Sequence, residues 1–287
     1  MLEIILDASQ LEVFESCPYK WYLDHKLNLT TKKPNPALST GSYFHAVLKH
    51  YYSGKQPLSG NVRETLELAK ELAYGPEASK WPKVRSDPKF YLNRLFSYFL
   101  NRVMDDDDMD IIAVEKGFSW LLYEDAHRRY ILEGMIDLVC YRKETKLTVV
   151  DHKTQSRYDE IYPYNHQCMN YLTFTGADYF LYNYIGLQDK QNENTFHRQP
   201  FRPPPDFLPQ WKRDVKNTFD EMSRYAEAIE SGEMGGEAYP RRRHACDSGK
   251  YGTCQFYQIC KVPDDSKWLP VVMSNYVEKA ERWKAWA

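Results

Sequence analysis

Two neighbouring predicted strands constrain this chain more than any other feature of its sequence, because acidic side chains stand inside them. Residues 130–142 and 147–153 are rich in β-branched, aromatic and other apolar residues, and the polar segment 143–146 between them predicts a β-hairpin. Asp137 interrupts the apolar run of the first strand, and an aspartate is costly to bury without a partner. The hairpin must therefore supply a partner for a carboxylate.

A second carboxylate and an ammonium group stand at the end of the second strand. Asp151 and Lys153 are two residues apart and project from the same face, so we expect both to meet Asp137 at one end of the hairpin. Carboxylate oxygens suit Mg²⁺ or Mn²⁺, which lower the pKa of a bound water and neutralise charge on a phosphate. A nearby lysine can stabilise an anionic transition state. A purely structural Asp–Lys ion pair is the alternative interpretation.

The next predicted helix, residues 164–174, adds two neutral polar side chains. Gln167 and Tyr171 are four residues apart and therefore share one helical face. They follow the strand end closely enough to face it, where an amide and a phenol can hold Lys153 or a phosphate oxygen. Taken alone, this pair would be read as surface polar residues.

These residues form three short motifs in a fixed order: Gly134-x-x-Asp137, Asp151-x-Lys153-Thr154 and Gln167-x-x-x-Tyr171. The arrangement resembles the RecB-like branch of the PD-(D/E)XK nuclease superfamily. That branch includes bacterial recombination nucleases, phage exonucleases and the CRISPR-associated exonucleases of the adaptation machinery. The resemblance extends from about Leu11 to Cys260, nearly the whole chain.

The resemblance implies a role for each of these residues. It implies a divalent metal site with four ligands: His45, Asp137, Asp151 and the main-chain carbonyl of His152. Relatives often carry Tyr in place of His152, whose side chain should therefore matter little. Lys153 would be the catalytic lysine, and Gln167 and Tyr171 would orient it and the DNA backbone. Glu115 matches an acidic position on the first core strand. Without the resemblance, His45 would be read as a packing histidine.

Three cysteines near the C-terminus, Cys246, Cys254 and Cys260, have the spacing C-x7-C-x5-C. Three thiols so close together indicate one soft-metal site, and Cys17, just before Pro18, is the best candidate for a fourth ligand. Four thiolates bind either zinc or an iron–sulfur cluster, and the spacing alone leaves both open. The other two cysteines, Cys140 and Cys168, are expected to be small buried hydrophobic residues.

The resemblance favours the cluster. Many RecB-like nucleases have one cysteine before the nuclease core and three after it, and together they hold a 4Fe–4S cluster that joins the N-terminal helix to the C-terminal segment. The same arrangement here would make the cluster structural. The neighbouring arginines 241–243 would then follow a DNA strand.

The order of predicted elements is helices, three strands, a helix, a strand and a helix, which is typical of an α/β fold with a mixed sheet. We expect the first helix to begin at Leu11, with Ser9 as its cap. With the resemblance, the expectation is a restriction-endonuclease-like core whose mixed central sheet is flanked by helices. It would be one nuclease domain, residues 1–287, with a helical insertion at 61–104 and an iron–sulfur segment at 240–262.

Composition narrows the function further. There are 38 basic and 40 acidic residues, a net charge of −2, so any contact with nucleic acid must come from local patches. We found neither a signal-peptide pattern nor an apolar run long enough to cross a membrane, which predicts an intracellular, cytoplasmic protein without membrane contact.

The resulting hypothesis is a Mg²⁺- or Mn²⁺-dependent deoxyribonuclease, an exonuclease acting on single-stranded DNA ends in recombination, repair or CRISPR adaptation. Single strands are favoured because Tyr162, Tyr164 and Tyr171 near the site could stack on unpaired bases. The alternative is a DNA-end-binding adaptor that trims DNA only within a larger complex with protein partners. A nuclease-like fold without activity is a weaker third interpretation, because the acidic residues and the lysine are intact.

Overall fold

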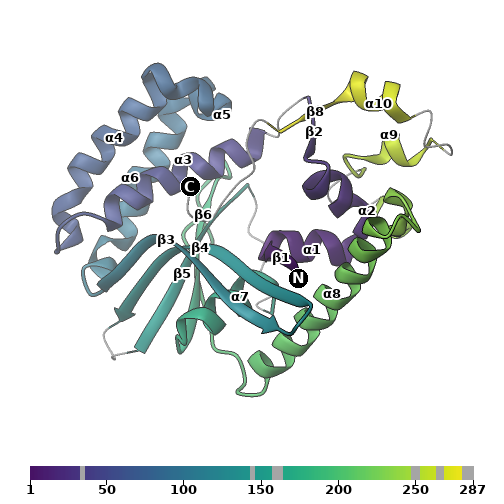
Figure 1. Cartoon of the computed structure of the whole chain (residues 1–287). Coiled ribbons are helices and arrows are strands. Elements are labelled where there is room, and N and C mark those ends of the chain that lie inside the picture. The colour runs from purple at the N-terminus through teal and green to yellow at the C-terminus, as the bar shows by residue number, and fades with distance from the viewer. Residues whose placement is uncertain (33–35, 143–145, 157–163, 247–252, 263–267, 280–287) are drawn as a thin grey trace. The chain divides into compact units, whose positions relative to one another are not determined.

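The computed structural model describes residues 1–32, 36–142, 146–156, 164–246, 253–262 and 268–279 (Figure 1). The strands are β1 (Leu2–Asp7), β2 (Leu29–Thr31), β3 (Asp110–Glu124), β4 (Arg128–Arg142), β5 (Lys146–Gln155), β6 (Tyr179–Gly186), β7 (Arg198–Phe201) and β8 (Tyr276–Glu278). The α-helices are α1 (Ala8–Ser16), α2 (Pro18–Trp21), α3 (Pro36–Tyr52), α4 (Val62–Tyr74), α5 (Pro82–Ser86), α6 (Pro88–Asp106), α7 (His166–Thr175), α8 (Phe207–Glu230), α9 (Tyr257–Cys260) and α10 (Trp268–Asn275).

The main sheet is mixed. It has six strands, in the order β1-β4-β5-β6-β7 with β3 paired to β4, and β2 and β8 form a separate antiparallel pair. This arrangement confirms the predicted α/β class with a mixed sheet. Most residues of the predicted turn 143–146 lie outside the described part of the chain.

The chain divides into two compact units. The first unit comprises Met1–Pro34, Ser119–Gly134 and Asp206–Ala287, and the second comprises Asn35–Phe118 and Met135–Pro205. The long strands β3 and β4 each contribute one half to either unit. Each unit is therefore assembled from segments that are far apart in the sequence.

In the second unit, helices cover both faces of the strands (Figure 1). β4 pairs with β5 in antiparallel register, β5 pairs with β6 in parallel register, and β6 pairs with β7 in antiparallel register. Successive side chains of a strand point to opposite faces. Accordingly, Leu181 of β6 joins the core beneath α3 and α6, whereas Phe180 meets Tyr171 of α7, with ring centroids 6.3 Å apart.

The predicted insertion is helical and belongs to the second unit. α6 begins where Asp87-Pro88 predicts it, because the Asp87 carboxylate accepts a hydrogen bond from the Phe90 amide at 3.2 Å. Its buried face packs on α3, where the rings of Phe99 and Tyr51 are 4.7 Å apart. The insertion therefore contributes to the core that supports β4 and β5.

In the first unit, β1 runs parallel to the first half of β4, from Leu2 opposite Arg128 to Asp7 opposite Glu133. The prediction for the first helix was wrong by three residues. α1 begins at Ala8, because Asp7 rather than Ser9 accepts the capping hydrogen bond, from the Gln10 amide at 2.8 Å.

The longest helix of the first unit, α8, packs against the sheet. It buries Trp211, Val215, Phe219 and Met222 on one face, at helical spacing. The ring of Phe219 stacks on Tyr130 of β4, with centroids 4.9 Å apart. Gly232 follows α8 with a φ of +73°, the left-handed conformation that glycine adopts readily at the C-terminal end of a helix.

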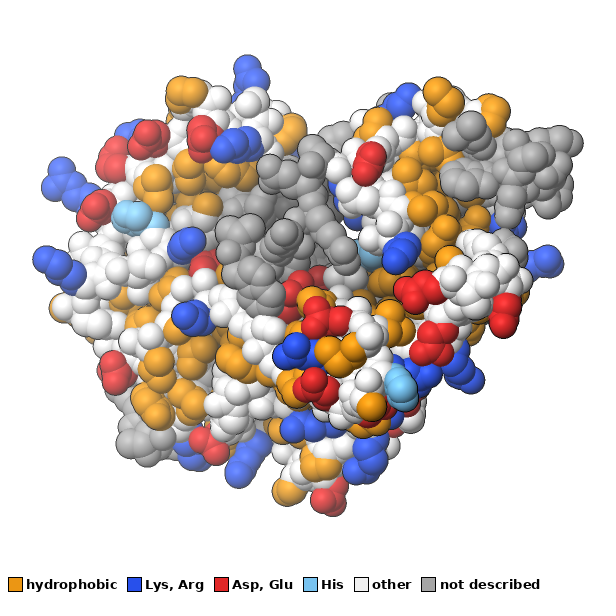
Figure 2. All heavy atoms as spheres, in the orientation of Figure 1, with side chains coloured by type: hydrophobic (Ala, Val, Ile, Leu, Met, Phe, Trp, Pro, Cys, Tyr) orange, Lys and Arg blue, Asp and Glu red, His pale blue; other side chains and the backbone are white. Residues whose placement is uncertain are grey.

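Charges are mixed on the surface. On the face shown in Figure 2, basic and acidic side chains are interspersed rather than segregated into one basic surface, in keeping with the net charge of −2. In the described part of the chain we found no helix with the length and apolar character needed to span a bilayer.

Candidate active site

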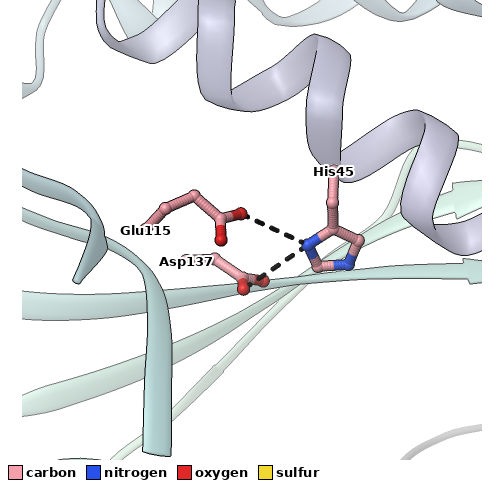
Figure 3. Close-up of side chains that lie close together, drawn as sticks. All are labelled: His45, Glu115 and Asp137. Carbon is pink, nitrogen blue, oxygen red and sulfur yellow. Dashed lines mark ion pairs between the residues drawn. The ribbon is translucent and has the colours of Figure 1, made fainter. Parts of the chain in front are cut away.

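Three side chains with metal-binding groups converge in the second unit: His45 of α3, Glu115 of β3 and Asp137 of β4 (Figure 3). One ligand atom from each lies within 4.8 Å of the others. His45 Nδ1 is 3.5 Å from Asp137 Oδ1 and 3.7 Å from Glu115 Oε1. Two carboxylate oxygens and one imidazole nitrogen form a donor set that fits a divalent cation such as Mn²⁺.

Glu115 reaches this group from an unusual backbone conformation. Its φ is +48°, in the left-handed region that residues other than glycine seldom adopt, although it lies within a strand. Such conformations are energetically unfavourable and are enriched at functional sites. In the sequence, Glu115 is marked only by its match to an acidic position of the family that the chain resembles. Its place beside His45 is a finding of the structure.

The carboxylates of Glu115 and Asp137 favour a positive charge between them. Burial alone would lower the pKa of His45, but hydrogen bonds with Asp137 and Glu115 and the charge of Asp151 outweigh it and raise the pKa to about 10. Burial acts to raise the pKa of Asp137, and the nearby His45 holds it below its usual value. The protonated imidazole thus balances the carboxylates where a metal ion would carry the positive charge.

The second acidic residue, Asp151, is fully buried beside Lys153. Lys153 Nζ lies 2.7 Å from Asp151 Oδ2, and burial raises the pKa of Asp151 to about 6, partly offset by the Lys153 charge. Asp151 is not one of the three residues whose ligand atoms lie within 4.8 Å of one another. Its predicted role as a metal ligand therefore stays a prediction.

Gln167 connects these groups to helix α7. Its Oε1 accepts a hydrogen bond from Lys153 Nζ at 2.7 Å, and its Nε2 donates to Asp151 Oδ1 at 3.0 Å. The amide thereby fixes the lysine and the carboxylate relative to each other. The helix begins next to it because Asn165 caps the Cys168 amide at 2.9 Å.

Tyr171 packs inside the protein, so the expectation that its ring stacks on an unpaired DNA base is wrong. It is only 5% exposed, and its hydroxyl donates to the Met135 carbonyl at 2.6 Å. It also accepts a hydrogen bond from Gln167 Nε2 at 3.1 Å, so it supports the amide that contacts Lys153. The Tyr164 ring packs against Phe201 at 5.1 Å, and Tyr162 lies outside the described residues.

His152 contacts the site through its backbone and is anchored by its side chain. Its amide donates to Asp137 Oδ2 at 2.7 Å. The side chain, which was expected to matter little, is 3% exposed and lies 2.9 Å from the Asn183 amide nitrogen. Burial lowers the pKa of His152 to about 3, so the ring is neutral. Metal ligation by its carbonyl stays a prediction.

The four cysteines predicted to form a soft-metal site come together in the first unit. Cys17, Cys246, Cys254 and Cys260 line one cavity of about 320 Å³. Burial raises the pKa of Cys260 to about 11, and the charges of the other three sulfurs add to the shift. The Arg242 amide lies 3.5 Å from Cys17 Sγ. Thiolates bind zinc and iron–sulfur clusters, and the binding of either by these four cysteines stays a prediction.

Basic side chains surround this cavity: Lys20, Arg241, Arg243 and Lys261 also line it. Their charges suit an anionic thiolate-bound metal group. The remaining cysteines, Cys140 and Cys168, are fully buried, as predicted. The role of the other four cysteines as metal ligands stays a prediction.

The comparisons with known proteins agree with this geometry. A family model of the PD-(D/E)XK nuclease superfamily matches residues 6–261, and the chain belongs to that superfamily. The α/β sheet flanked by helices is consistent with its restriction-endonuclease-like fold, and membership makes the chain a metal-dependent nuclease with DNA as the implied substrate.

The other two comparisons add little. No curated protein matches the chain. Among solved structures it is similar to the one described as "Crystal structure of SSO0001", at 16% identity over 64% of this chain and 82% of that chain, with a TM-score of 0.31. A TM-score of this size adds nothing to the family assignment.

Proposed function

We propose that the chain is a Mg²⁺- or Mn²⁺-dependent exodeoxyribonuclease of the RecB-like branch that acts on single-stranded DNA ends. The observation that carries the proposal is the convergence of His45, Glu115 and Asp137 beside the Asp151–Lys153 pair. The preference for single strands and for ends rests on the RecB-like resemblance. Under this proposal residues 1–287 form one intracellular nuclease domain, which serves recombination, repair or CRISPR adaptation.

Each residue of the site has a defined task in this proposal. His45, Glu115 and Asp137 hold the cation, with Asp151 and the His152 carbonyl as further ligands. When bound, the cation supplies an acidic water and neutralises charge on the scissile phosphate. Lys153 presents its ammonium group to the same phosphate and is held in place by Gln167, which is itself held by Tyr171.

We further propose that the four cysteines of the first unit hold a 4Fe–4S cluster. The cavity of about 320 Å³ accommodates a group of several atoms, and its four basic residues offset the negative charge of a thiolate-bound cluster. The cluster would join α1 to the C-terminal segment 240–262 and would thus be structural. Zinc is the alternative, and iron analysis of the purified protein separates the two.

A cleavage assay tests the proposed activity. End-labelled single-stranded and double-stranded DNA are incubated with the protein in Mg²⁺, in Mn²⁺ or in EDTA. The proposal predicts metal-dependent shortening of single strands from one end, and a ladder of products. Cleavage within circular single strands would contradict exonuclease action, and equal cleavage in EDTA would contradict a metal-dependent mechanism.

A second candidate, a DNA-end-binding adaptor, is favoured by one feature of the insertion. Phe96, Leu100 and Met104 of α6 lie at four-residue spacing and are 51%, 67% and 75% exposed, an apolar stripe of the kind that binds other proteins. Binding of DNA ends by the isolated chain without cleavage in either metal would support this candidate over the first.

A further inference from the structure

A closed ring of buried polar groups lies against the face of β5 opposite Asp151 and Lys153. Asp151 and Lys153 point to one face of the strand, so His152 between them points to the other. There His152 neighbours Asn183, its register partner on β6. The ring is formed by His152, Asn183, Arg198, Asp106 and Tyr52, of which Arg198, at 8%, has the most exposed side chain.

Arg198 fixes the orientation of the Asn183 amide. Arg198 Nε donates to Asn183 Oδ1 at 3.1 Å, and because a guanidinium has only donors, that atom must be the oxygen. The Asn183 nitrogen then donates both its hydrogens, one to Tyr98 at 2.8 Å and one to His152 Nδ1 at 2.9 Å. His152 Nδ1 is therefore an acceptor, and the neutral ring carries its proton on Nε2.

The remaining members close the ring around the imidazole. Arg198 pairs with the buried carboxylate of Asp106, at the end of α6. Asp106 Oδ2 in turn accepts a hydrogen bond from the Tyr52 hydroxyl at 3.1 Å. The Tyr52 ring stacks on His152, with centroids 5.3 Å apart and planes 10° apart. The His152 side chain is thus held by a hydrogen bond and by stacking.

The position of the His152 side chain matters because the backbone amide of the same residue contacts Asp137. The ladder between β4 and β5 runs from Arg142 opposite Lys146 to Leu138 opposite Val150. Just past that last pair, the His152 amide donates to the Asp137 carboxylate at 2.7 Å. Asp137 Oδ2 is thereby occupied, and Oδ1 is the oxygen that lies 3.5 Å from His45. The amide determines which carboxylate oxygen faces the metal-binding group.

We propose that His152 is a positioning residue: its side chain, held by Asn183 and Tyr52, fixes the amide that orients Asp137 and so sets the affinity of the site for a divalent cation. The inference rests on the proposed function, since it concerns the same cation. It also gives helix α6 a role, because Asp106 at the end of α6 closes the ring that holds His152. Groups that support a metal ligand typically change metal affinity by about 10- to 100-fold.

Direct binding of Mn²⁺, measured by calorimetry and by the loss of the free-ion electron paramagnetic resonance signal, tests the proposal. His152→Leu removes the acceptor for Asn183 and the stacked ring. We expect it to weaken Mn²⁺ binding about tenfold or more. The Mn²⁺ concentration for half-maximal cleavage should rise by the same factor, while kcat at saturating Mn²⁺ changes less than about threefold.

Three further variants keep the test decisive. Asn183→Leu keeps His152 and similar side-chain volume but removes the hydrogen bond, and it should weaken Mn²⁺ binding like His152→Leu. His152→Asn places an amide oxygen near the position of Nδ1 and should restore affinity to within about threefold of wild type. His50→Leu replaces a histidine of α3 that is hydrogen-bonded to Thr65, outside the site, and serves as the control.

The outcomes separate the possible failures. If His152→Leu or Asn183→Leu has the wild-type circular dichroism spectrum and binds Mn²⁺ within twofold of wild type, the positioning role is wrong. If His152→Asn folds but binds as weakly as the leucine variant, the hydrogen bond to Asn183 is not what matters, and the proposal fails. If wild type itself binds no Mn²⁺, the proposed function fails and the positioning role fails with it.

Discussion

The two units each gather metal-binding side chains, but they do so with different chemistry and from different kinds of structure. The second unit places one imidazole and two carboxylates on a helix and two strands, within 4.8 Å of one another. The first unit places four thiols around a cavity of about 320 Å³, one at the end of α1 and three after residue 240, where Cys260 ends the short helix α9. Hard oxygen donors and soft sulfur donors select different metals.

This difference indicates a division of labour. Ligands on regular elements keep a fixed geometry, which suits a site that must orient a reacting phosphate. Ligands on short segments far apart in the sequence suit a group that holds those segments together. We therefore expect changes in the second unit to affect catalysis and changes in the first unit to affect stability.

The largest expected effect is that of removing Asp137. Asp137→Ala should abolish cleavage and weaken Mn²⁺ binding by more than about 100-fold, because residues that merely support a ligand already account for about 10- to 100-fold. Calorimetric Mn²⁺ titration and a cleavage assay measure both. The iron content and visible spectrum should not change. A variant that still cleaves at a tenth of the wild-type rate would break the assignment of this residue.

Lys153→Ala should reduce kcat by about 100- to 1,000-fold, the range found when one preorganised donor to the transition state is lost. Mn²⁺ binding should be as tight as in wild type or tighter, because a positive charge next to Asp151 has been removed. Single-turnover cleavage at saturating Mn²⁺ measures the effect. Lys190→Ala, an exposed lysine of the same unit, is the matched control. If Lys153→Ala cleaves DNA at the wild-type rate, Lys153 forms a structural ion pair with Asp151 and has no catalytic role.

Cys254→Ser tests the cysteine site of the first unit. We expect loss of iron and of the absorbance near 400 nm that is typical of a cluster, with a lower Tm. Mn²⁺ affinity should stay within about twofold of wild type, because the two sites use different ligands. EDTA should have the converse effect, stopping cleavage while the absorbance persists. If the wild-type protein is colourless and contains stoichiometric zinc, the four cysteines bind zinc and the cluster proposal is wrong.

The smallest expected effect concerns the two cysteines that line neither site. Burial raises the pKa of Cys140 to about 11, so at pH 8 only about one thiol in 1,000 is the reactive thiolate. Cys140 and Cys168 should therefore resist iodoacetamide from pH 7 to pH 9, while the four cavity cysteines become labelled once their metal is removed. Mass spectrometry of tryptic peptides measures this. Rapid labelling of Cys140 in folded protein would show that its core opens.

Local sequence signals predicted most of the second unit. The apolar runs of β4 and β5, the Asp87-Pro88 start of α6 and the spacing of Gln167 and Tyr171 each depend on residues close together in the chain. The structure accordingly has the predicted hairpin strands, to within two residues at each end. Strand periodicity places Asp151 and Lys153 on one face, and helix periodicity places Gln167 and Tyr171 on one face. The contact of Gln167 with Lys153 and Asp151 comes from the structure.

Other features depend on partners far away in the sequence, and the sequence did not reveal them. β1 pairs in parallel with β4, more than a hundred residues later, and no local turn signals such a pairing. The left-handed φ of Glu115 arises from tertiary structure, which no local propensity predicts. The buried ring around His152 joins five elements, so a pattern of short motifs could not indicate that its side chain is held in place.

The central claim is that His45, Glu115 and Asp137 surround a divalent cation. The most direct measurement is a crystal soaked in Mn²⁺, with diffraction data collected at the manganese absorption edge. We predict an anomalous peak at bonding distance, about 2.0–2.3 Å, from His45 and Asp137. A crystal in which these side chains are ordered and manganese binds only elsewhere would contradict it.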